Sequence, residues 1–383
     1  MNLSRIVLLE FDSKPNDLGK GKKISDGLSA VLQIGKTLWV ANDESIRLER
    51  LGLDEIVDTG YCHGKDHKQF KLAEYLELPA AKGEADLEGL AYADGYLWLV
   101  GSHSLKRKKP KPDNNGDYDY SEVDEKLAEL EGGGNRYLLA RIPVENDADG
   151  VPCLQKTSGK RRAARLRGDA FGDDLTLALR GDKHLSPFLP IPPTATDDPW
   201  RGIPGKDNGF DIEGLATVGK RLFIGLRGPV LRGWAVVLEV EPVEDGDGSS
   251  WLRLKPVGPN GQLYRKHFLQ LGGLGVRDLC AQGSDLLVLA GPTMDLDGPS
   301  RLFLWPGGAE PQAEAETVAR SGQSRLLLDL PFGEGEDHAE GIGLFDCGGG
   351  GADAVIVVYD AASKRRQSGE NTLLADVFTL PAV

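Results

Sequence analysis

The chain has 383 residues, of which 40% are hydrophobic and 27% charged, and its formal net charge at pH 7 is −14. This acidic balance excludes nucleic acid as a general partner, because phosphate binding needs a clustered basic face. No segment approaches the ~20 apolar residues of a membrane-spanning helix, so no membrane partner is expected.

The chain opens with a short apolar segment, SRIVLLEF at residues 4–11, which predicts a β-strand. This run is too short for the core of a signal peptide. The cysteines show no metal-binding spacing; they are Cys62, Cys153, Cys280 and Cys347. We therefore expect a cytoplasmic protein in which Cys280, inside an apolar strand pattern, is a reduced core thiol.

Five later segments share one pattern: an apolar strand, a short polar turn and a second apolar strand. They begin near residues 25, 86, 211, 275 and 338, and the clearest read DLEGLAYADGYLWLVG and DIEGLATVGKRLFIGLRGP. A glycine in each short turn supplies the positive φ that a tight hairpin needs. One or two strand-like runs follow each hairpin, for example RLFLW and RLLLDL after the fourth. A repeated unit of this kind is typical of a propeller blade.

The repeat predicts an all-β fold: a single β-propeller domain over residues 1–383, with five blades favoured and six as the alternative. The gap between the second and third copies is twice the usual spacing, and we interpret it as insertions at about 105–135 and 157–208. Short helices are expected there, at SEVDEKLAELEGG with Ser121 as N-cap and at DDLTLALRGDKHLSPF. The N-terminal strand should pair with the last blade, around Thr372 to Leu380, and close the ring, because unpaired edges promote aggregation.

The hairpin geometry places the start of each first strand and the end of each second strand at the same end of the unit. Aligning the copies gives one equivalent position near that end, occupied by Asp26, Glu88, Glu213, Arg277 and Glu340. Asp86, Asp211 and His338 stand two residues earlier, and the second strands end near Asp43, His103, Arg227 and Asp360. These side chains should converge on one mouth, beside the basic run LKRKKPKP at 105–112.

Converging carboxylates repel one another unless a cation or a shared proton relieves them. Calcium or magnesium, which prefer oxygen ligands, could fill that role, although no contiguous calcium loop is present. The candidate metal ligands are Asp86, Glu88, Asp211, Glu213 and Glu340. The candidate catalytic residues are His103, Arg227 and His338, and the candidate substrate-binding residues are Arg277 and Asp360.

A structural alternative stands beside this interpretation. The carboxylates of the Asp-x-Glu-Gly elements could accept backbone N–H groups from the next blade, with the glycine allowing two backbones to approach closely. His63 and His67 carry no further ligand pattern, and their segment, YCHGKDHKQ, indicates a solvated loop.

The elements KDNGFDIEGLA, GLRGPVLRGWAVVLEV and HAEGIGL resemble those of the bacterial DUF3616 proteins, a family of uncharacterised function in the β-propeller group. This resemblance covers nearly the whole chain and implies the propeller, with no catalytic residues to transfer. The shorter DxEGLA element is similar to one in the esterase-like phytase propellers, which implies phosphoester hydrolysis with a bound divalent cation.

Two functions remain open. The first is a metal-assisted hydrolase of a small anionic ester, for instance a phosphate ester. The second is a non-catalytic propeller whose mouth binds a ligand or a protein. The absence of GxSxG, nucleophilic cysteine and nucleotide-loop patterns does not choose between them.

Overall fold

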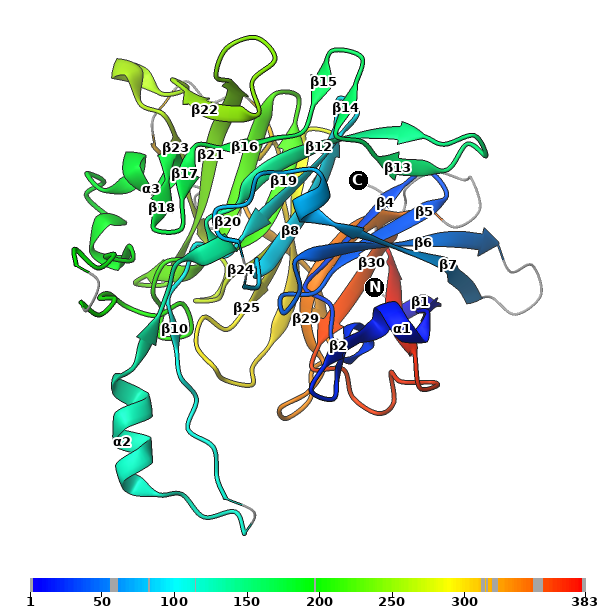
Figure 1. The fold of residues 1–383 in the computed structure, drawn as a ribbon, viewed down its shortest axis with the longest axis horizontal. Coiled ribbons are helices and arrows are strands. Elements are labelled where there is room, and N and C mark those ends of the chain that lie inside the picture. Colours follow the sequence, from blue (N-terminus) through cyan, green and yellow to red (C-terminus); the bar gives the residue numbers. More distant parts are fainter. Residues whose placement is uncertain are drawn as a thin grey trace.

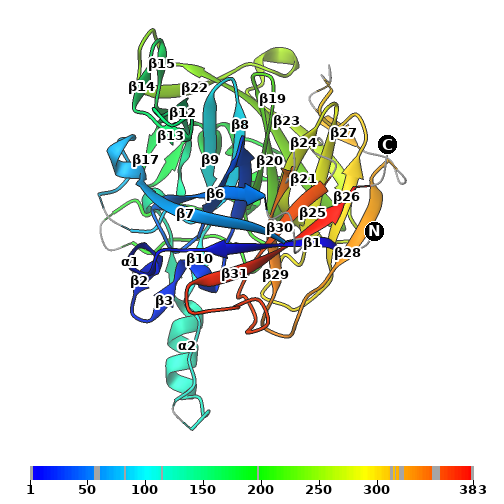
Figure 2. The same cartoon turned by 90° about the vertical axis from the view of Figure 1, so that its right-hand side faces the viewer.

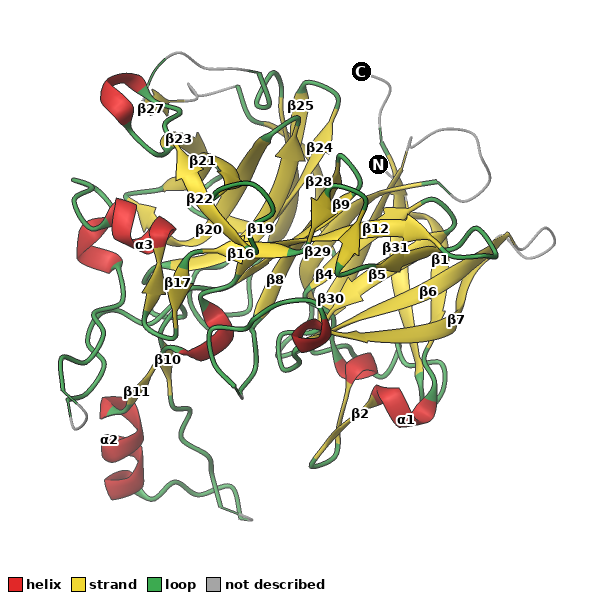
Figure 3. Cartoon of the chain, turned by 45° about the horizontal axis from the view of Figure 1, so that its top comes forward, coloured by secondary structure: helices red, strands yellow, loops and turns green. Residues whose placement is uncertain are grey.

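The fold is mostly β, with few helices, in a propeller-like arrangement of sheets (Figure 1). The computed structural model describes residues 3–55, 61–81, 83–113, 115–195, 198–310, 314, 316–318, 323–346 and 354–380. Strands fill the centre, and helices lie at the periphery (Figure 3). None of the described helices is long and apolar enough to cross a membrane.

All five predicted hairpins are present. They are β4 (Ala30–Ile34) with β5 (Thr37–Ala41), β8 (Leu87–Ala93) with β9 (Tyr96–Gly101), β19 (Asp211–Val218) with β20 (Arg221–Leu231), β24 (Gly275–Gln282) with β25 (Asp285–Gly291), and β29 (His338–Phe345) with β30 (Ala354–Asp360). Four of the turns contain a glycine at positive φ, as predicted; these are Gly35, Gly95, Gly219 and Gly283. Most of the connection between β29 and β30 lies outside the described residues.

Outer strands extend each hairpin. The first hairpin is extended by β6 (Arg47–Glu55) and β7 (Tyr61–Lys71), and the second by β12 (Leu139–Asn146). The third is extended by β21 (Trp234–Glu244) and β23 (Arg265–Gln270), and the fourth by β26 (Ser300–Trp305) and β28 (Arg325–Leu330). The fifth is extended by β31 (Thr372–Thr379). Two shorter strands flank them, β22 (Trp251–Lys255) and β27 (Glu316–Val318).

The prediction of a solvated loop around His63 and His67 is wrong. The segment forms the long strand β7, and the His67 ring is buried, with Nε2 2.7 Å from the Glu49 carboxylate and Nδ1 accepting from the Asp12 amide. The buried His67 ring is paired with Glu49, which lies eighteen residues away in the sequence. Local hydrophobic periodicity does not reveal such a partner.

The first strands of the hairpins contact one another in a cycle. β4 contacts β8, β8 contacts β19, β19 contacts β24, β24 contacts β29, and β29 contacts β4. Apolar side chains fill the spaces between neighbouring sheets; Leu215 and Ile224, for example, share one cluster with Trp98 and Val100 of the preceding sheet. The inner strands therefore have both faces buried, which explains their nearly continuous apolar sequences.

The two ends of the chain meet in one sheet. β1 (Leu3–Glu10) pairs antiparallel with β31, as the sequence predicted, and parallel with β7 on its other side. Figure 2 shows β1 and β31 side by side. Val7 and Leu9 of β1 are fully buried between the sheets.

Apart from β12, the strands between β9 and β19 are short. A long arm leaves the body through β10 (Lys106–Arg107), carries helix α2 (Tyr120–Ala128) and returns through β11 (Leu130–Glu131) (Figure 1). The predicted helix is confirmed, but its N-cap is Asp119 and not Ser121: the Asp119 carboxylate accepts from the amides of Ser121 and Glu122. The second predicted helix is shorter than expected, α3 (Asp174–Leu179).

The cysteines only partly match the expectation. Cys280 is a free thiol whose pKa burial raises to about 12, and Cys153 is also free. Cys62 is disulfide-bonded, a feature more common in oxidising compartments than in the cytoplasm.

Candidate functional site

A β-bulge near the start of the inner strand recurs in four of the five hairpins. The register shifts there place one extra residue opposite the second strand. A bulge re-aims its side chain out of the regular alternation. The bulged residues are Glu88, Glu213, Arg277 and Glu340, which the sequence alignment had placed as equivalent. Asp26 was aligned wrongly: it is exposed on a 3-10 turn, and β4 pairs with β5 without a bulge.

The residue after the bulge is where neighbouring inner strands approach closely. A Cβ on Gly89 would lie 2.7 Å from Cβ of Leu215, and one on Gly341 would lie 2.8 Å from Cα of Ala30. The predicted role of these glycines in close backbone packing is therefore confirmed.

In β24 the same position holds Asp278, and this residue is the latch between sheets. Its carboxylate accepts from the Leu279 amide at 2.7 Å and from the Ile342 amide of β29 at 2.8 Å. Burial raises the pKa of Asp278 well above its usual value, against the lowering effect of these hydrogen bonds. The latch chemistry expected of the Glu-Gly elements thus belongs to an aspartate that sequence reasoning did not single out.

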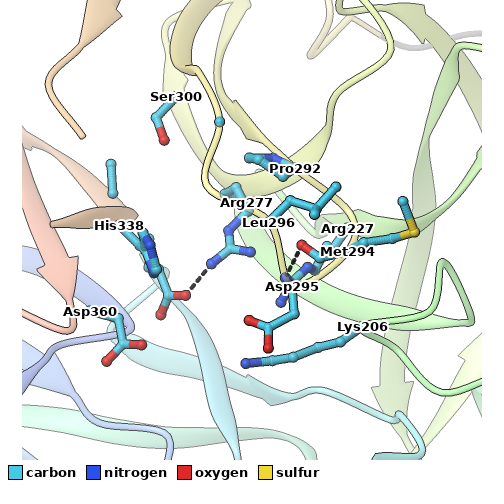
Figure 4. Close-up of a pocket in the computed structure, with 13 residues that line it drawn as sticks. Lys206, Arg227, Arg277, Pro292, Met294, Asp295, Leu296, Ser300, His338 and Asp360 are labelled. Atoms are coloured by element: carbon cyan, nitrogen blue, oxygen red, sulfur yellow. Dashed lines mark hydrogen bonds and ion pairs between the residues drawn. The ribbon is translucent and has the colours of Figure 1, made fainter. Parts of the chain in front are cut away.

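A polar cavity of about 360 Å³ opens at the bulged end of the inner strands. It is lined by seven of the predicted residues: Asp86, Glu88, Asp211, Glu213, Arg227, Glu340 and Asp360. A smaller adjoining cavity of about 40 Å³ shares Arg227, Glu340 and Asp360 with it, and adds Arg277 and His338 (Figure 4). The predicted basic run borders the larger cavity through Lys106 to Pro110.

Arginines neutralise part of this acidic lining. Glu213 lies between Arg227, whose Nη1 donates to it at 2.9 Å, and Arg277, whose Nε is 2.8 Å away. Arg277 also pairs with Glu340, and Arg136 pairs with Asp86. Glu213, Arg227 and Arg277 are each at least 94% buried, so these ion pairs are shielded from solvent.

Asp86 is held in a strained backbone position. Its φ is +50°, which is rare for a residue with a side chain, and Ser102 Oγ donates to its carboxylate. His103, across the same strand pair, has φ of +54°. Backbone strain of this kind concentrates at functional sites, where surrounding structure must maintain it.

Four carboxyl groups of the cavity are without such partners. Within the described part of the chain, no hydrogen bond or ion pair is found for the carboxyls of Asp43, Glu88, Asp211 and Asp360. Burial, followed by the charges of neighbouring carboxylates, raises the pKa of Asp43 to about 7 and that of Glu88 well above its usual value. Burial and the Glu213 charge likewise raise the pKa of Asp211 to about 7, although Arg227 opposes this.

His103 does not line either cavity. It is fully buried, with Nε2 2.9 Å from the Asp173 carboxylate and Nδ1 2.8 Å from the Gly101 carbonyl. Burial alone would lower its pKa, but the Asp173 charge and these hydrogen bonds outweigh burial and raise it. Both ring nitrogens are thus engaged, and the structure places His103 beside the cavities and not in their lining.

His338 borders the smaller cavity but is turned toward a surface partner. Its Nε2 lies 3.2 Å from the Asp297 carboxylate, and its side chain is one-third exposed. It is therefore at the edge of the site, and Arg227 is the only one of the three predicted catalytic residues that lines the larger cavity.

Sequence reasoning missed two cations of the site, Arg136 and Lys206. Lys206 lies in the loop before β19, and its side chain points across the cavity toward Asp360 (Figure 4). Neither residue belongs to the repeated hairpin, so the comparison of copies could not reveal it. The only signal for Lys206 was its place in KDNGFDIEGLA, directly before the most regular copy.

The donor set does not fit a resident metal ion. Of the five predicted ligands, Asp86, Glu213 and Glu340 are already paired with arginines. No group of three or more carboxylate, imidazole or thiol side chains is arranged to hold an ion in the parts of the chain that the structure describes.

A family model for DUF3616, described as a protein of unknown function, matches residues 27–376. The chain belongs to the DUF3616 family. The five hairpins described above lie within the matched range. No curated protein matches this DUF3616 chain.

Three solved structures to which the DUF3616 chain is similar have low sequence identity to it. Hydrazine synthase from Kuenenia stuttgartiensis is 8% identical, with 94% of this chain and 65% of that chain covered and a TM-score of 0.32. AztD from Citrobacter koseri is 13% identical over 89% of this chain and 71% of that one, with a TM-score of 0.28. A humanized mutant of Chaetomium thermophilum Polycomb Repressive Complex 2, bound to an inhibitor, is 10% identical over 99% and 97%, with a TM-score of 0.32. These similarities are too low to indicate a shared activity.

Proposed function

We propose that this DUF3616 protein is a five-bladed propeller that binds a small polar ligand in the cavity at the bulged end of its inner strands. The observation that carries the proposal is that four carboxyl groups from four different hairpins line one cavity. Buried or half-buried carboxyls are costly to leave without partners, and a bound ligand would supply them.

The cyclic contacts among β4, β8, β19, β24 and β29 support five blades. Since β8 contacts β19 directly, the residues between them other than β9 and β12 would be insertions into one domain and not a sixth blade. The pairing of β1 with β31 supports closure of the ring by the N-terminal strand.

The size and lining of the cavity support binding of a small molecule. Its volume of about 360 Å³ falls within the roughly 300–1,000 Å³ of ligand pockets in proteins. Charged groups surround most of it, while Leu105, Pro110 and Leu127 form an apolar edge. Binding of a protein partner finds less support, since the carboxyls lie inside a concave site.

Hydrolysis of a small anionic ester is a second proposal, favoured by the carboxyl pKa values. Glu88, whose pKa burial raises well above its usual value, could give a proton to a leaving group. Asp211, with a pKa of about 7, could take a proton from water. Because the donor set does not fit calcium or magnesium, no step is assigned to either ion.

The test is a thermal-shift screen of the full chain against amines, amino acids, polyols, carboxylates and phosphate esters. We expect at least one class to raise the melting temperature, and Glu88→Gln to abolish that rise. Asp329→Asn, the same chemical change at an exposed ion pair with Arg301, should leave it intact. Release of a chromogenic alcohol from a phosphate ester, lost in Glu88→Gln, would favour the hydrolase. A screen in which no compound binds would exclude both proposals.

A further inference from the structure

The inventory of charges in the cavity indicates what kind of ligand it takes. Resting on the ligand-binding function proposed above, we infer that the ligand is a small organic cation, an aliphatic amine with two ammonium groups. The carboxyls of Asp43, Glu88, Asp211 and Asp360 would receive the ammonium groups.

The basic run at the rim does not supply the missing positive charge. Each of the four cations of this run that line the cavity already has an acidic partner: Lys106 with Glu84 at 3.6 Å, Arg107 with Asp207 at 2.7 Å, Lys108 with Glu131 at 3.2 Å, and Lys109 with Asp295 at 3.4 Å. The fifth cation of the run, Lys111, is not among the lining residues. The deeper arginines are likewise engaged with Asp86, Glu213 and Glu340.

One cation is left over among the lining residues that the structure describes. Lys206 makes no ion pair there, while four carboxyl groups have no partner. If all were ionised, the unpaired groups would carry four negative charges against one positive charge, an excess of three. The protein alone can relieve this excess only by taking up protons, which agrees with the raised carboxyl pKa values of Asp43, Glu88 and Asp211.

Asp211 shows that the excess of unpaired carboxyl groups is not confined to solvated surface residues. It is only 5% exposed, yet its carboxyl lines the cavity without a hydrogen-bond donor from the described residues. A buried, unsatisfied carboxyl directed at a cavity is expected where a ligand provides the donor.

The arrangement of the carboxyls favours an amine over a metal ion. They come from four different hairpins: Asp43 follows β5, Glu88 lies in β8, Asp211 begins β19 and Asp360 ends β30. Groups spread around a cavity suit separate donors on one molecule, and each ammonium group has three N–H donors. The apolar edge of Leu105, Pro110 and Leu127 would contact the methylene chain between the ammonium groups.

Binding of such a cation should release protons. A positive charge beside the carboxyls favours their ionised form and lowers their pKa values. At pH 7, groups that were partly protonated would therefore lose protons when the amine binds. Affinity should rise as the pH increases from 6 to 8, because fewer protons remain to be displaced.

The experiment is calorimetric titration of the full chain with 1,4-diaminobutane at pH 7, in two buffers with different ionisation enthalpies. We expect binding with net proton release, and at least tenfold weaker binding of the uncharged analogue 1,4-butanediol. Asp211→Asn should weaken diamine binding at least tenfold, while Asp329→Asn should not change it. Glu88→Gln, at a half-buried site, replaces Asp211→Asn if that variant does not fold.

The remaining outcomes decide against the inference. If the diamine does not bind but another compound of the screen does, the amine assignment is wrong and the ligand-binding function stands. Binding of succinate with proton uptake would identify an anionic ligand instead. Calcium binding that displaces the diamine would identify a metal site. If nothing binds, both the amine and the binding function are wrong.

Discussion

Glu213 is a buried carboxylate of the cavity that pairs with two arginines. It is 4% exposed and lies between the guanidinium groups of Arg227 and Arg277. Removing one partner of a buried ion pair leaves uncompensated charge, which costs about 3–5 kcal/mol. We therefore expect Glu213→Gln to lower the free energy of unfolding by this amount in urea titrations.

The control for Glu213→Gln is Asp329→Asn, whose exposed pair with Arg301 should contribute less than about 1 kcal/mol. Both variants should unfold identically in calcium and in chelator. Wild-type stability that rises with calcium, and a rise that Glu213→Gln removes, would instead favour the metal site predicted from the sequence.

Asp211 gives the protein an unusual pH dependence. Because its pKa is raised from 3.8 to about 7 in the folded state, protonation favours folding. The stabilising effect is fully present below pH 3.8 and is lost as the pH rises through 7. At about 1.4 kcal/mol per pKa unit, the loss is at most about 4 kcal/mol.

The free energy of unfolding should therefore fall between pH 5 and 8 more steeply in the wild type than in Asp211→Asn, which cannot ionise there. Urea unfolding at several pH values measures the difference. Parallel profiles for the two proteins would show that Asp211 titrates normally.

Among the elements, the arm that carries α2 is separable from the body, but its base is not. α2 has no buried residue, whereas Leu105 and Asn135 at the two ends of the predicted insertion are fully buried. We expect replacement of residues 108–129 by a short glycine linker to change stability by less than about 1 kcal/mol. Replacement of residues 105–135 should cost several times more, since it removes Leu105 from the core.

The two replacements are compared by thermal unfolding. Equal, small effects would mean that Leu105 and Asn135 do not anchor the arm. A large effect of the shorter replacement would show that contacts of the arm with the body, such as the ion pair of Lys109 with Asp295, stabilise the fold.

The hairpins could be predicted from the sequence because their apolar strands and glycine turns are local patterns. The equivalence of Glu88, Glu213, Arg277 and Glu340 followed from the repeat as well. The bulge that aims these side chains depends on strand pairing, which the pattern does not specify. Lys206 and Arg136 lie outside the repeat, and only the three-dimensional fold brings them to the carboxyls.

At the scale of the whole molecule, β1 joins the last strand of the fold to the first sheet segment, because it lies between two strands and is hydrogen-bonded to both. It pairs with β31 on one side and β7 on the other, and buries Val7 and Leu9. Deletion of residues 1–12 should expose two strand edges and an apolar surface, so the truncated chain should aggregate or fail to fold. Solubility and thermal unfolding measure this, with the chain lacking 108–129 as the control. A soluble truncated protein with unchanged melting would show that β1 is dispensable.

The same pairing sets the order of events during synthesis. β1 leaves the ribosome long before β31, because most of the described chain lies between them. At roughly 5–20 residues per second, synthesis of that stretch takes about 20–70 seconds. Throughout that time β1 lacks its antiparallel neighbour, so the nascent chain carries an apolar strand that a chaperone would have reason to cover.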